Sequence, residues 1–192
     1  NTITPQLLIT PAKGKTFDPN LAYLQQLKTN KKIISYTEVL AENALVWYKD
    51  KQSPALIKGV SNNFLKNNTL DSIIVEGYFI LDNAAGPTAV VGSALQTYLN
   101  VNLSDPFDKL QIYSPKKGIK TSSINPMDDF TVLNIAASGV FEVQQEFDNV
   151  MIVPLSFARG LFNEKENRFE PDAQFNQIFG EKTTVKYLKE DA

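Results

Sequence analysis

The densest carboxylates of the sequence are the side chains best suited to acid–base or metal chemistry. Asp128 and Asp129 are adjacent, and Glu142, Glu146 and Asp148 follow further along the chain. Two carboxyl groups can act as the acid and base of a glycosidase-like hydrolase, and a set of carboxylates can hold a cation. Two of the glutamates, however, fall on the polar side of a predicted strand, and no calcium-loop pattern of the D-x-[DN]-x-[DN]-G type occurs. Ordinary exposed charge is the simpler interpretation, and a carboxylate-dependent hydrolase around the adjacent aspartates is kept as a third hypothesis.

Two short motifs imitate nucleotide and acyl-enzyme sites. Gly14-Lys15-Thr16 matches the end of a phosphate-binding loop, but Ile9 occupies the place of the leading glycine and the next helix is predicted to begin only at Pro19. Ser114-Pro115-Lys116-Lys117 has the S-x-x-K spacing of serine acyl-enzymes, yet it falls in a predicted loop and lacks the companion motifs. Together with Lys120, the lysines of this segment indicate a solvated basic loop. Neither motif predicts a site.

Trp47 and Tyr48 are large aromatic neighbours that could stack on a sugar or a base, although aromatic residues on a strand usually belong to the core. A secreted peptide- or glycan-binding module that uses these two residues is the second hypothesis. Asn67-Asn68-Thr69 and Asn102-Leu103-Ser104 fit the N-glycosylation pattern, which matters only in a eukaryotic secretory setting. Both sequons are discounted.

Histidine and cysteine are absent from all 192 residues. Without imidazole or thiolate, the chain can form no Ser-His-Asp triad, no Cys-His dyad and no His-ligated zinc or iron site. Carboxylate, Lys, Tyr or Ser would have to carry any chemistry. The sequence therefore predicts no catalytic residue, no cofactor and no metal ligand, and a protein that is not an enzyme.

Composition and charge indicate an ordinary globular domain. The chain is 43% hydrophobic and 21% charged, close to the averages for proteins that fold around a core. Its 19 basic and 21 acidic residues give a formal net charge of -2, too weak a field to favour nucleic acid as a partner. No apolar stretch approaches the roughly 20 residues that span a bilayer, and no secretory signal opens the chain. Because it begins at Asn1 without a Met, we expect a processed protein or an excised piece.

Hydrophobic periodicity and turn residues predict an α+β fold with strands in the middle and helices toward both ends. Helices are predicted to be capped by Asp18, Ser93 and Ser156, and the second should present one shared face. That face consists of Leu95, Tyr98 and Leu99. Strands are predicted over residues 7–10, 33–48, 56–60, 71–81, 88–91, 109–113, 139–147, 150–153 and 183–188, and helices over 19–28, 93–99, 156–162 and the segment between Pro171 and Gly180.

Short apolar, glycine-marked segments recur in a fixed order along almost the whole chain. In this order the sequence resembles the periplasmic core domain of MacB- and FtsX-like ABC transporter permeases, and its opening resembles the lipoprotein-releasing, LolC/LolE-type permeases of Bacteroidetes. The segments are Leu8–Lys15, Ile57-Lys58-Gly59-Val60, Val75-Glu76-Gly77-Tyr78-Phe79, Ala89–Ser93, Asp105-Pro106-Phe107, Leu110-Gln111-Ile112-Tyr113, Ser138-Gly139-Val140-Phe141 and Ile152-Val153-Pro154-Leu155. Family members usually place a further strand after the helix ending near Phe162. Here Asn163 to Arg168 runs straight into Phe169-Glu170-Pro171, so either that strand was lost or residues are missing there.

The resemblance implies a porter-like βαβ frame built from both chain ends, residues 1–60 and 139–192, with a β-rich subdomain of residues 61–138 inserted between them. In such permeases the domain lies on the periplasmic side of the inner membrane, between the first and second membrane helices. The implied partners are a second permease copy or paralogue, a separate cytoplasmic ATPase, and a cargo lipoprotein or periplasmic chaperone. The implied role is mechanical: ATP-driven motion is transmitted to cargo.

Two expectations accompany the resemblance. The parent gene should encode an apolar segment just before Asn1 and three more after Ala192. The isolated domain should be a monomer or a weak dimer, because the sequence shows no apolar seam left over for tight pairing.

Overall fold

A computed structural model of the chain describes residues 7–11, 20–30, 33, 36–66, 70–105, 108–116, 126–143, 149–163 and 183–187. Contacts divide the chain into two compact units. One unit is built from both ends, Asn1–Tyr36 with Glu166–Ala192, and the other from Thr37–Lys165. The division at residues 60 and 138 into frame and inserted subdomain stays a prediction. None of the helices within the described ranges is long and apolar enough to cross a bilayer.

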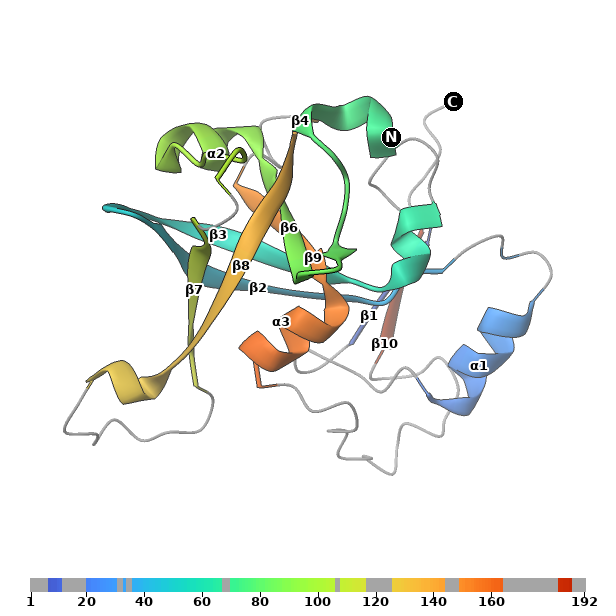
Figure 1. Ribbon diagram of the computed structural model, residues 1–192. Coiled ribbons are helices and arrows are strands. Elements are labelled where there is room, and N and C mark those ends of the chain that lie inside the picture. The colour runs from blue at the N-terminus through green and yellow to red at the C-terminus, as the bar shows by residue number, and fades with distance from the viewer. Residues whose placement is uncertain are drawn as a thin grey trace. The chain divides into compact units, whose positions relative to one another are not determined.

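The unit of the two chain ends contains β1 (Leu7–Pro11), α1 (Ala22–Thr29) and β10 (Thr183–Tyr187) (Figure 1). β1 and β10 pair antiparallel, with Leu7 opposite Tyr187. The strands predicted at the two ends of the chain are thus confirmed. A βαβ unit joins parallel strands, so the porter-like βαβ frame stays a prediction.

Helix α1 begins at Ala22, three residues later than the predicted start at Pro19. Leu21 occupies the N-cap position and offers no side-chain acceptor, whereas the predicted cap, Asp18, lies outside the described residues. The helix buries Leu24. No side chain therefore caps α1 at its N-cap position.

The unit of residues 37–165 is built on one eight-stranded sheet whose order is β4-β8-β7-β2-β3-β9-β6-β5, and β8 also pairs with β6. The strands from β8 through β7, β2, β3 and β9 to β6 therefore close into a small barrel (Figure 1). The pairings β3–β9 and β6–β8 are parallel, and the others are antiparallel. The strands are β2 (Val39–Tyr48), β3 (Lys51–Val60), β4 (Ile74–Gly77), β5 (Asp82–Asn83), β6 (Gly86–Gly92), β7 (Leu110–Pro115), β8 (Phe130–Phe141) and β9 (Val150–Pro154).

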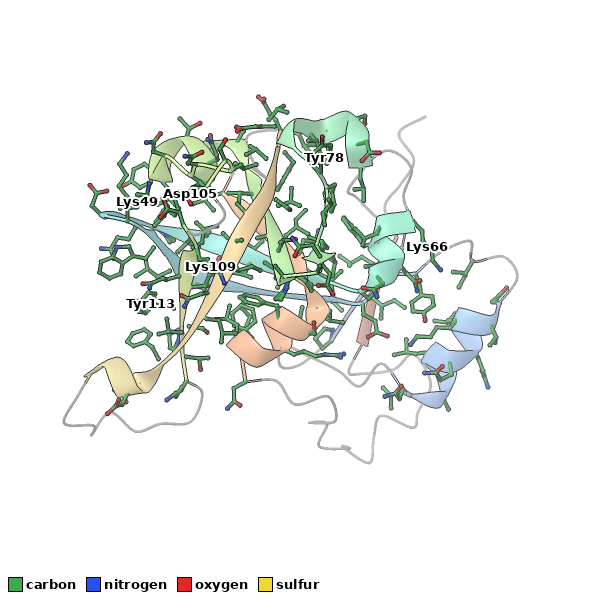
Figure 2. All side chains as sticks on the ribbon, viewed as in Figure 1. Lys49, Lys66, Tyr78, Asp105, Lys109 and Tyr113 are labelled. Atoms are coloured by element: carbon green, nitrogen blue, oxygen red, sulfur yellow. The ribbon has the colours of Figure 1, made fainter. Side chains whose placement is uncertain are left out.

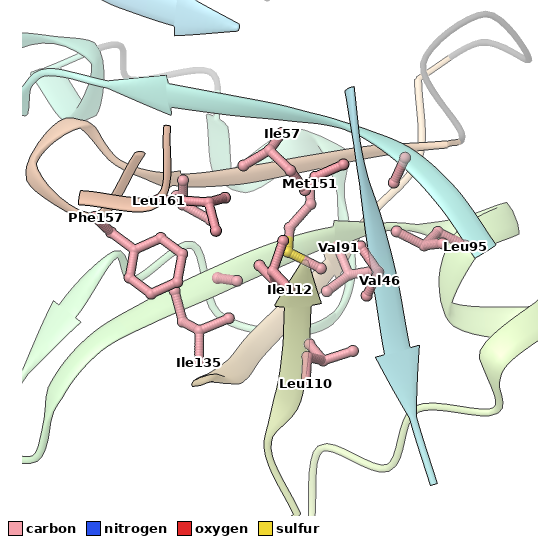
Figure 3. Close-up of a cluster of buried hydrophobic side chains, with 14 of the residues drawn as sticks. Val46, Ile57, Val91, Leu95, Leu110, Ile112, Ile135, Met151, Phe157 and Leu161 are labelled. Carbon is pink, nitrogen blue, oxygen red and sulfur yellow. The ribbon is translucent and has the colours of Figure 1, made fainter. Parts of the chain in front are cut away.

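Alternation along the strands fills the barrel interior with apolar side chains, as a barrel of this size requires. Figure 3 shows the cluster, in which Leu95 of α2 (Ser93–Leu99) and Phe157 of α3 (Leu155–Leu161) lie at opposite ends. The two helices therefore contribute to the core from different sides. The most deeply buried members include Val46, Ile57, Val91, Leu110, Ile112, Ile135, Met151 and Leu161.

The predicted strand over residues 139–147 is wrong in its bounds, because β8 covers Phe130–Phe141 instead. The first half of β8 pairs with β7 and the second half with β6, so its position is set by two strands distant in sequence. Phe141 is buried and Glu142 is exposed, as the alternation predicts, but Gln144–Asp148 lie outside the described residues. The predicted helix between Pro171 and Gly180 also lies outside them.

The predicted serine caps are wrong. The N-cap residues of α2 and α3 are Gly92 and Pro154, and neither makes a side-chain capping bond. Both helices follow directly from buried strands, β6 and β9, so the strand that enters each helix sets its start. Tyr98 does not share the buried face of α2, since it is 60% exposed.

Asn100 ends α2 in the left-handed conformation, with φ 58° and ψ 47°, and its N–H donates to the carbonyl of Gln96. Asparagine tolerates this region better than alanine, and glycine does so without strain. We expect Asn100→Ala to lower the free energy of unfolding by about 1 kcal/mol and Asn100→Gly to leave it unchanged or raise it slightly. Urea denaturation of the two variants checks this, and equal losses in both would contradict it.

Candidate functional surface

Two of the carboxylates weighed for catalysis, Asp128 and Asp129, lie at the rim of the barrel, whereas Glu146 and Asp148 lie outside the described residues. Asp128 and Asp129 belong to a 3-10 turn (Pro126–Asp129) just before β8. Lys116 ties this turn to the end of β7: its Nζ donates to the carbonyl of Asp128 at 2.8 Å, and its backbone N–H donates to the carbonyl of Asp129 at 2.8 Å. Among the described residues, no three acidic side chains gather closely enough to hold a metal ion. The aspartates thus help to join β7 to β8.

Ser114 lies in β7 and is only 4% exposed. The prediction of a solvated loop at Ser114 is wrong, because the pairing of β7 with β8 extends the strand to Pro115. An acyl-enzyme serine stands at a helix start in reach of its substrate, which a buried strand position does not provide. Lys117, Lys120 and Gly14-Lys15-Thr16 lie outside the described residues.

Trp47 and Tyr48 point to opposite faces of β2, as successive residues of a strand must. Tyr48 is 1% exposed, its hydroxyl donates to Asp108 Oδ2 at 3.4 Å, and it accepts from the backbone N–H of Asn102 at 3.2 Å. Lys49 Nζ lies 2.6 Å from the same carboxylate, and this hydrogen bond raises the pKa of Lys49. Tyr48 is therefore a core residue, and the two aromatic side chains cannot form one stacking surface.

Trp47 instead lies beside Tyr113, a residue far from it in sequence. The two ring centroids are 5.8 Å apart, with the planes tilted by 42°. Figure 2 shows Tyr113 on β7 and Lys49 at the tip of the β2–β3 hairpin. Both rings are held in place, because Trp47 Nε1 donates to the carbonyl of Lys49 at 2.8 Å and the Tyr113 hydroxyl donates to Gln111 Oε1 at 3.0 Å. The local sequence could not predict this pair, because only the register between β2 and β7 brings the two rings together.

These aromatic residues belong to the side of β3, β2, β7 and β8 that faces away from the barrel interior, which we call the outer face. One line of directly paired residues crosses it from strand to strand: Pro54 opposite Leu45, Leu45 opposite Tyr113, and Tyr113 opposite Val132. We call these four residues the apolar row. The amide side chains of Asn43, Gln52, Gln111 and Asn134 lie on the same face and are exposed. These amide and apolar side chains can make contacts with a partner, but they do not transfer protons.

Lys58 stands on the outer face of β3 between Ala41 and Ile152 of the neighbouring strands. Burial lowers the pKa of Lys58, because the charged ammonium is partly removed from water. A lysine whose pKa is lower in the folded chain binds fewer protons there than in the unfolded chain. The free-energy cost of keeping the Lys58 ammonium charged in the folded chain is therefore present at neutral pH. This cost decreases as the pH rises from the pKa of Lys58 in the folded chain toward the ordinary lysine value of 10.5.

Replacing Lys58 with methionine should thus raise the free energy of unfolding at pH 7 by about 1 kcal/mol. The gain over the unmodified chain should shrink as the pH approaches 10.5. Denaturation curves between pH 7 and 10.5 check both points. Lys49→Met is the matched control, because Lys49 is paired with Asp108 and its loss should not stabilise the fold. A gain that is independent of pH would contradict the assignment to desolvation.

No protein-family model matches the chain, and no curated protein matches it in sequence. Several solved structures are similar to it, among them the following two. The extracellular domain of the noncanonic ABC-type transporter YknZ from Gram-positive bacteria is 13% identical, with a TM-score of 0.49, covering 96% of this chain and 83% of that one. The periplasmic region of MacB from Actinobacillus actinomycetemcomitans is 12% identical, with a TM-score of 0.47, covering 97% and 75%. Both neighbours are extracytoplasmic parts of ABC-type transporters.

Proposed function

We propose that the chain is the extracytoplasmic domain of an ABC transporter permease and that its task is mechanical rather than catalytic. The observation that carries this proposal is the pairing of the two ends of the described structure. Because β1 and β10 are antiparallel with Leu7 opposite Tyr187, the chain enters at the start of β1 and leaves at the end of β10, on the same side. A domain inserted between two consecutive membrane helices needs this arrangement, since both connections must reach one membrane surface.

Three of the segments that carry the sequence resemblance take structural positions in the unit of residues 37–165. Gly59 lies where α3 packs on β3, and Gly77 ends β4 with φ 70° beside Gly139 of β8. Val153-Pro154-Leu155 joins β9 to α3. These are positions where backbone geometry demands a particular residue, so the resemblance supports a shared fold more directly than a shared ligand.

The closed barrel and the paired ends suit a part that relays motion. A barrel has no free edge between its paired strands and resists bending, so it moves as one body. β1 and β10 are hydrogen-bonded along their whole length, and a displacement of one membrane connection is therefore passed to the other. We infer that a separate cytoplasmic ATPase drives the membrane helices, that two permease copies work as a pair, and that the cargo is a lipoprotein or another substrate at the periplasmic side of the inner membrane.

Pulsed electron–electron double resonance, which measures the distance between two spin labels, tests the proposal on the parent protein. The chain contains no cysteine, so Tyr98→Cys gives one labelling site within this domain, at a 60% exposed position on α2, once any cysteines elsewhere in the parent protein have been replaced by serine. In the reconstituted transporter, the label-to-label distance between two copies should shift by several ångströms when ATP is added. Val75→Cys, 58% exposed on β4, provides a second and independent site.

Two results would contradict the proposal. The first is a parent reading frame that encodes no membrane-spanning segments around this domain, which would favour a secreted binding module. The second is an unchanged distance at both labels while the ATPase turns over.

A further inference from the structure

The outer face carries a second line of directly paired residues beside the apolar row. Gln52 of β3 lies opposite Trp47 of β2, Trp47 lies opposite Gln111 of β7, and Gln111 lies opposite Asn134 of β8. We call these four residues the amide row. At the usual strand spacing the row is about 14 Å long, with a carboxamide about 5 Å to each side of Trp47. No local segment of the sequence shows the row, because each strand contributes one residue to it.

The carboxamides of the amide row keep hydrogen-bonding capacity that the chain itself does not use. Gln52 and Asn134 are exposed, and neither side chain hydrogen-bonds to another described residue. Gln111 Oε1 accepts from the Tyr113 hydroxyl, which leaves the NH2 group of Gln111 as a donor for a ligand. Asparagine is depleted in strands, and Asn43 is a second exposed one on this face. The face thus offers hydrogen-bond donors and acceptors that a ligand can fill.

The two aromatic side chains offer ring surface rather than polar groups. The indole N–H of Trp47 and the hydroxyl of Tyr113 already donate to atoms of the same chain. These bonds hold both rings in place without a ligand, so binding requires little further ordering of the two side chains. Trp47 is 38% exposed, and the two ring planes are tilted by 42°, so the apolar surface that they form is bent rather than flat.

Aromatic rings bordered by carboxamides match the chemistry of a neutral sugar. A pyranose ring presents C–H bonds on its faces, which pack on an aromatic ring, and hydroxyl groups around its edge, which both donate and accept hydrogen bonds. A carboxamide also donates and accepts, so it can pair with two neighbouring hydroxyls at once.

Charge excludes the other flat polar ligands. A nucleotide or an acidic sugar brings phosphate or carboxylate groups, which are bound by cationic side chains. Among the described outward-pointing positions of β2, β3, β7 and β8, only Lys58 is charged, and it is half-buried at the end away from Trp47. The face therefore fits an uncharged ligand that is apolar on its faces and hydroxylated at its edges.

We propose that the outer face, through the amide row and the ring of Tyr113, binds a neutral oligosaccharide. The row is long enough, at about 14 Å, for more than one sugar ring. This binding site is additional to the mechanical task proposed above and does not depend on it. Its test needs only the isolated chain.

Fluorescence titration is the first experiment, because Trp47 is the only tryptophan of the chain and its emission reports on this face alone. The probes are neutral tetrasaccharides of glucose, N-acetylglucosamine, mannose or galactose. At least one of them should shift the emission to shorter wavelength in a saturable way, with a Kd below about 1 mM. Because no charged group takes part, that Kd should change by less than about twofold between about 50 mM and about 500 mM NaCl.

Variants of the carboxamides keep the tryptophan signal and test their part in binding. Gln52→Ala and Asn134→Ala should each weaken binding by about three- to tenfold, because each removes hydrogen bonds to the sugar hydroxyls. Gln26→Ala is the matched control, since Gln26 is an exposed amide on α1 and does not belong to the outer face. It should leave the Kd within about twofold of that of the unmodified chain.

Variants of Tyr113 test the stacking contact. Tyr113→Leu keeps an apolar side chain but removes the ring, and it should weaken binding by about tenfold. Tyr113→Phe keeps the ring and should retain binding within about threefold. Tyr98→Leu makes the same aromatic change at an exposed position of α2, outside the outer face, and should have no effect. Circular dichroism and thermal unfolding confirm that each variant is folded, and the carboxamide variants carry the test if Tyr113→Leu unfolds the chain.

Two outcomes would overturn the proposal. The first is a Trp47 emission that none of the tetrasaccharides changes at about 10 mM, which would leave the face to a protein surface. The second is binding that the carboxamide variants and Tyr113→Leu all leave unchanged, which would put the sugar elsewhere on the chain. Neither outcome bears on the transporter proposal, which depends on the distance change in the parent protein, and a failed distance change would leave a measured sugar affinity intact.

Discussion

Replacing Gly77 with alanine should lower the free energy of unfolding by about 4 kcal/mol. Gly77 has φ 70°, where an L-residue is strained by about 1 kcal/mol. The larger contribution is steric. A Cβ here would overlap the carbonyl oxygen of Ser138 and lie 2.9 Å from Cα of Gly139. Both atoms are backbone, so relief requires β4 to move away from β8. Urea denaturation should show a lower midpoint with an unchanged slope.

Gly86→Ala separates the two causes of this loss. Gly86 also has a positive φ, 116°, but a Cβ there would meet no atom within 4 Å. Gly86→Ala should therefore lower the free energy of unfolding through backbone strain alone, by about 1 to 2 kcal/mol. If Gly77→Ala costs no more than Gly86→Ala, the close approach of β4 to β8 does not constrain the fold.

Gly59→Ala is expected to produce the second largest effect, a loss of about 3 kcal/mol. Gly59 has an ordinary backbone conformation, so the cause is packing alone. A Cβ at this position would overlap Cβ of Ala158, which is fully buried in α3, and would lie 3.4 Å from Cα of Leu155. Helix α3 would have to shift away from β3, which loosens its contacts in the core. Thermal and urea unfolding measure the loss.

Two further variants make this result specific. Ala158→Gly in the Gly59→Ala background removes the overlapping atom and should restore part of the stability, although glycine in a helix itself costs about 1 kcal/mol. Gly160→Ala, two residues along the same helix, should instead raise stability by about 0.5 to 1 kcal/mol, because its Cβ would make an ordinary contact of 3.7 Å with Leu133. A double variant no more stable than Gly59→Ala would contradict the steric explanation.

These glycines connect the fold to the proposed role. Gly59 lets α3 pack closely on the barrel wall, and Gly77 with Gly139 lets β4 approach β8. A domain that relays motion must not absorb it by internal bending, and close backbone contacts of this kind resist such bending. Destabilising variants at these positions should therefore also reduce the nucleotide-dependent distance change in the parent protein.

The residue types alone were enough to show which kinds of catalytic group the chain lacks. Local sequence patterns were enough to predict much of its secondary structure. The absence of His and Cys excludes triads and thiolates whatever the fold. Apolar alternation and turn residues located the β2–β3 hairpin, the buried strands β6 and β9, and the two terminal strands. They also predicted a helix over residues 156–162, where α3 (Leu155–Leu161) lies. These features depend on neighbouring residues, and periodicity reports them directly.

Which strands are neighbours became clear only from the folded chain. The parallel pairing of β6 with β8 closes the barrel and fixes the bounds of β8, yet nothing local to residues 130–141 indicates it. Pairing between distant strands also brings Leu45, Tyr113 and Val132 together across the outer face, and Trp47 lies there beside Tyr113 rather than with Tyr48. The physical reason is that a strand's own pattern says which of its sides is apolar, whereas its partner and register are fixed by contacts between segments distant along the chain.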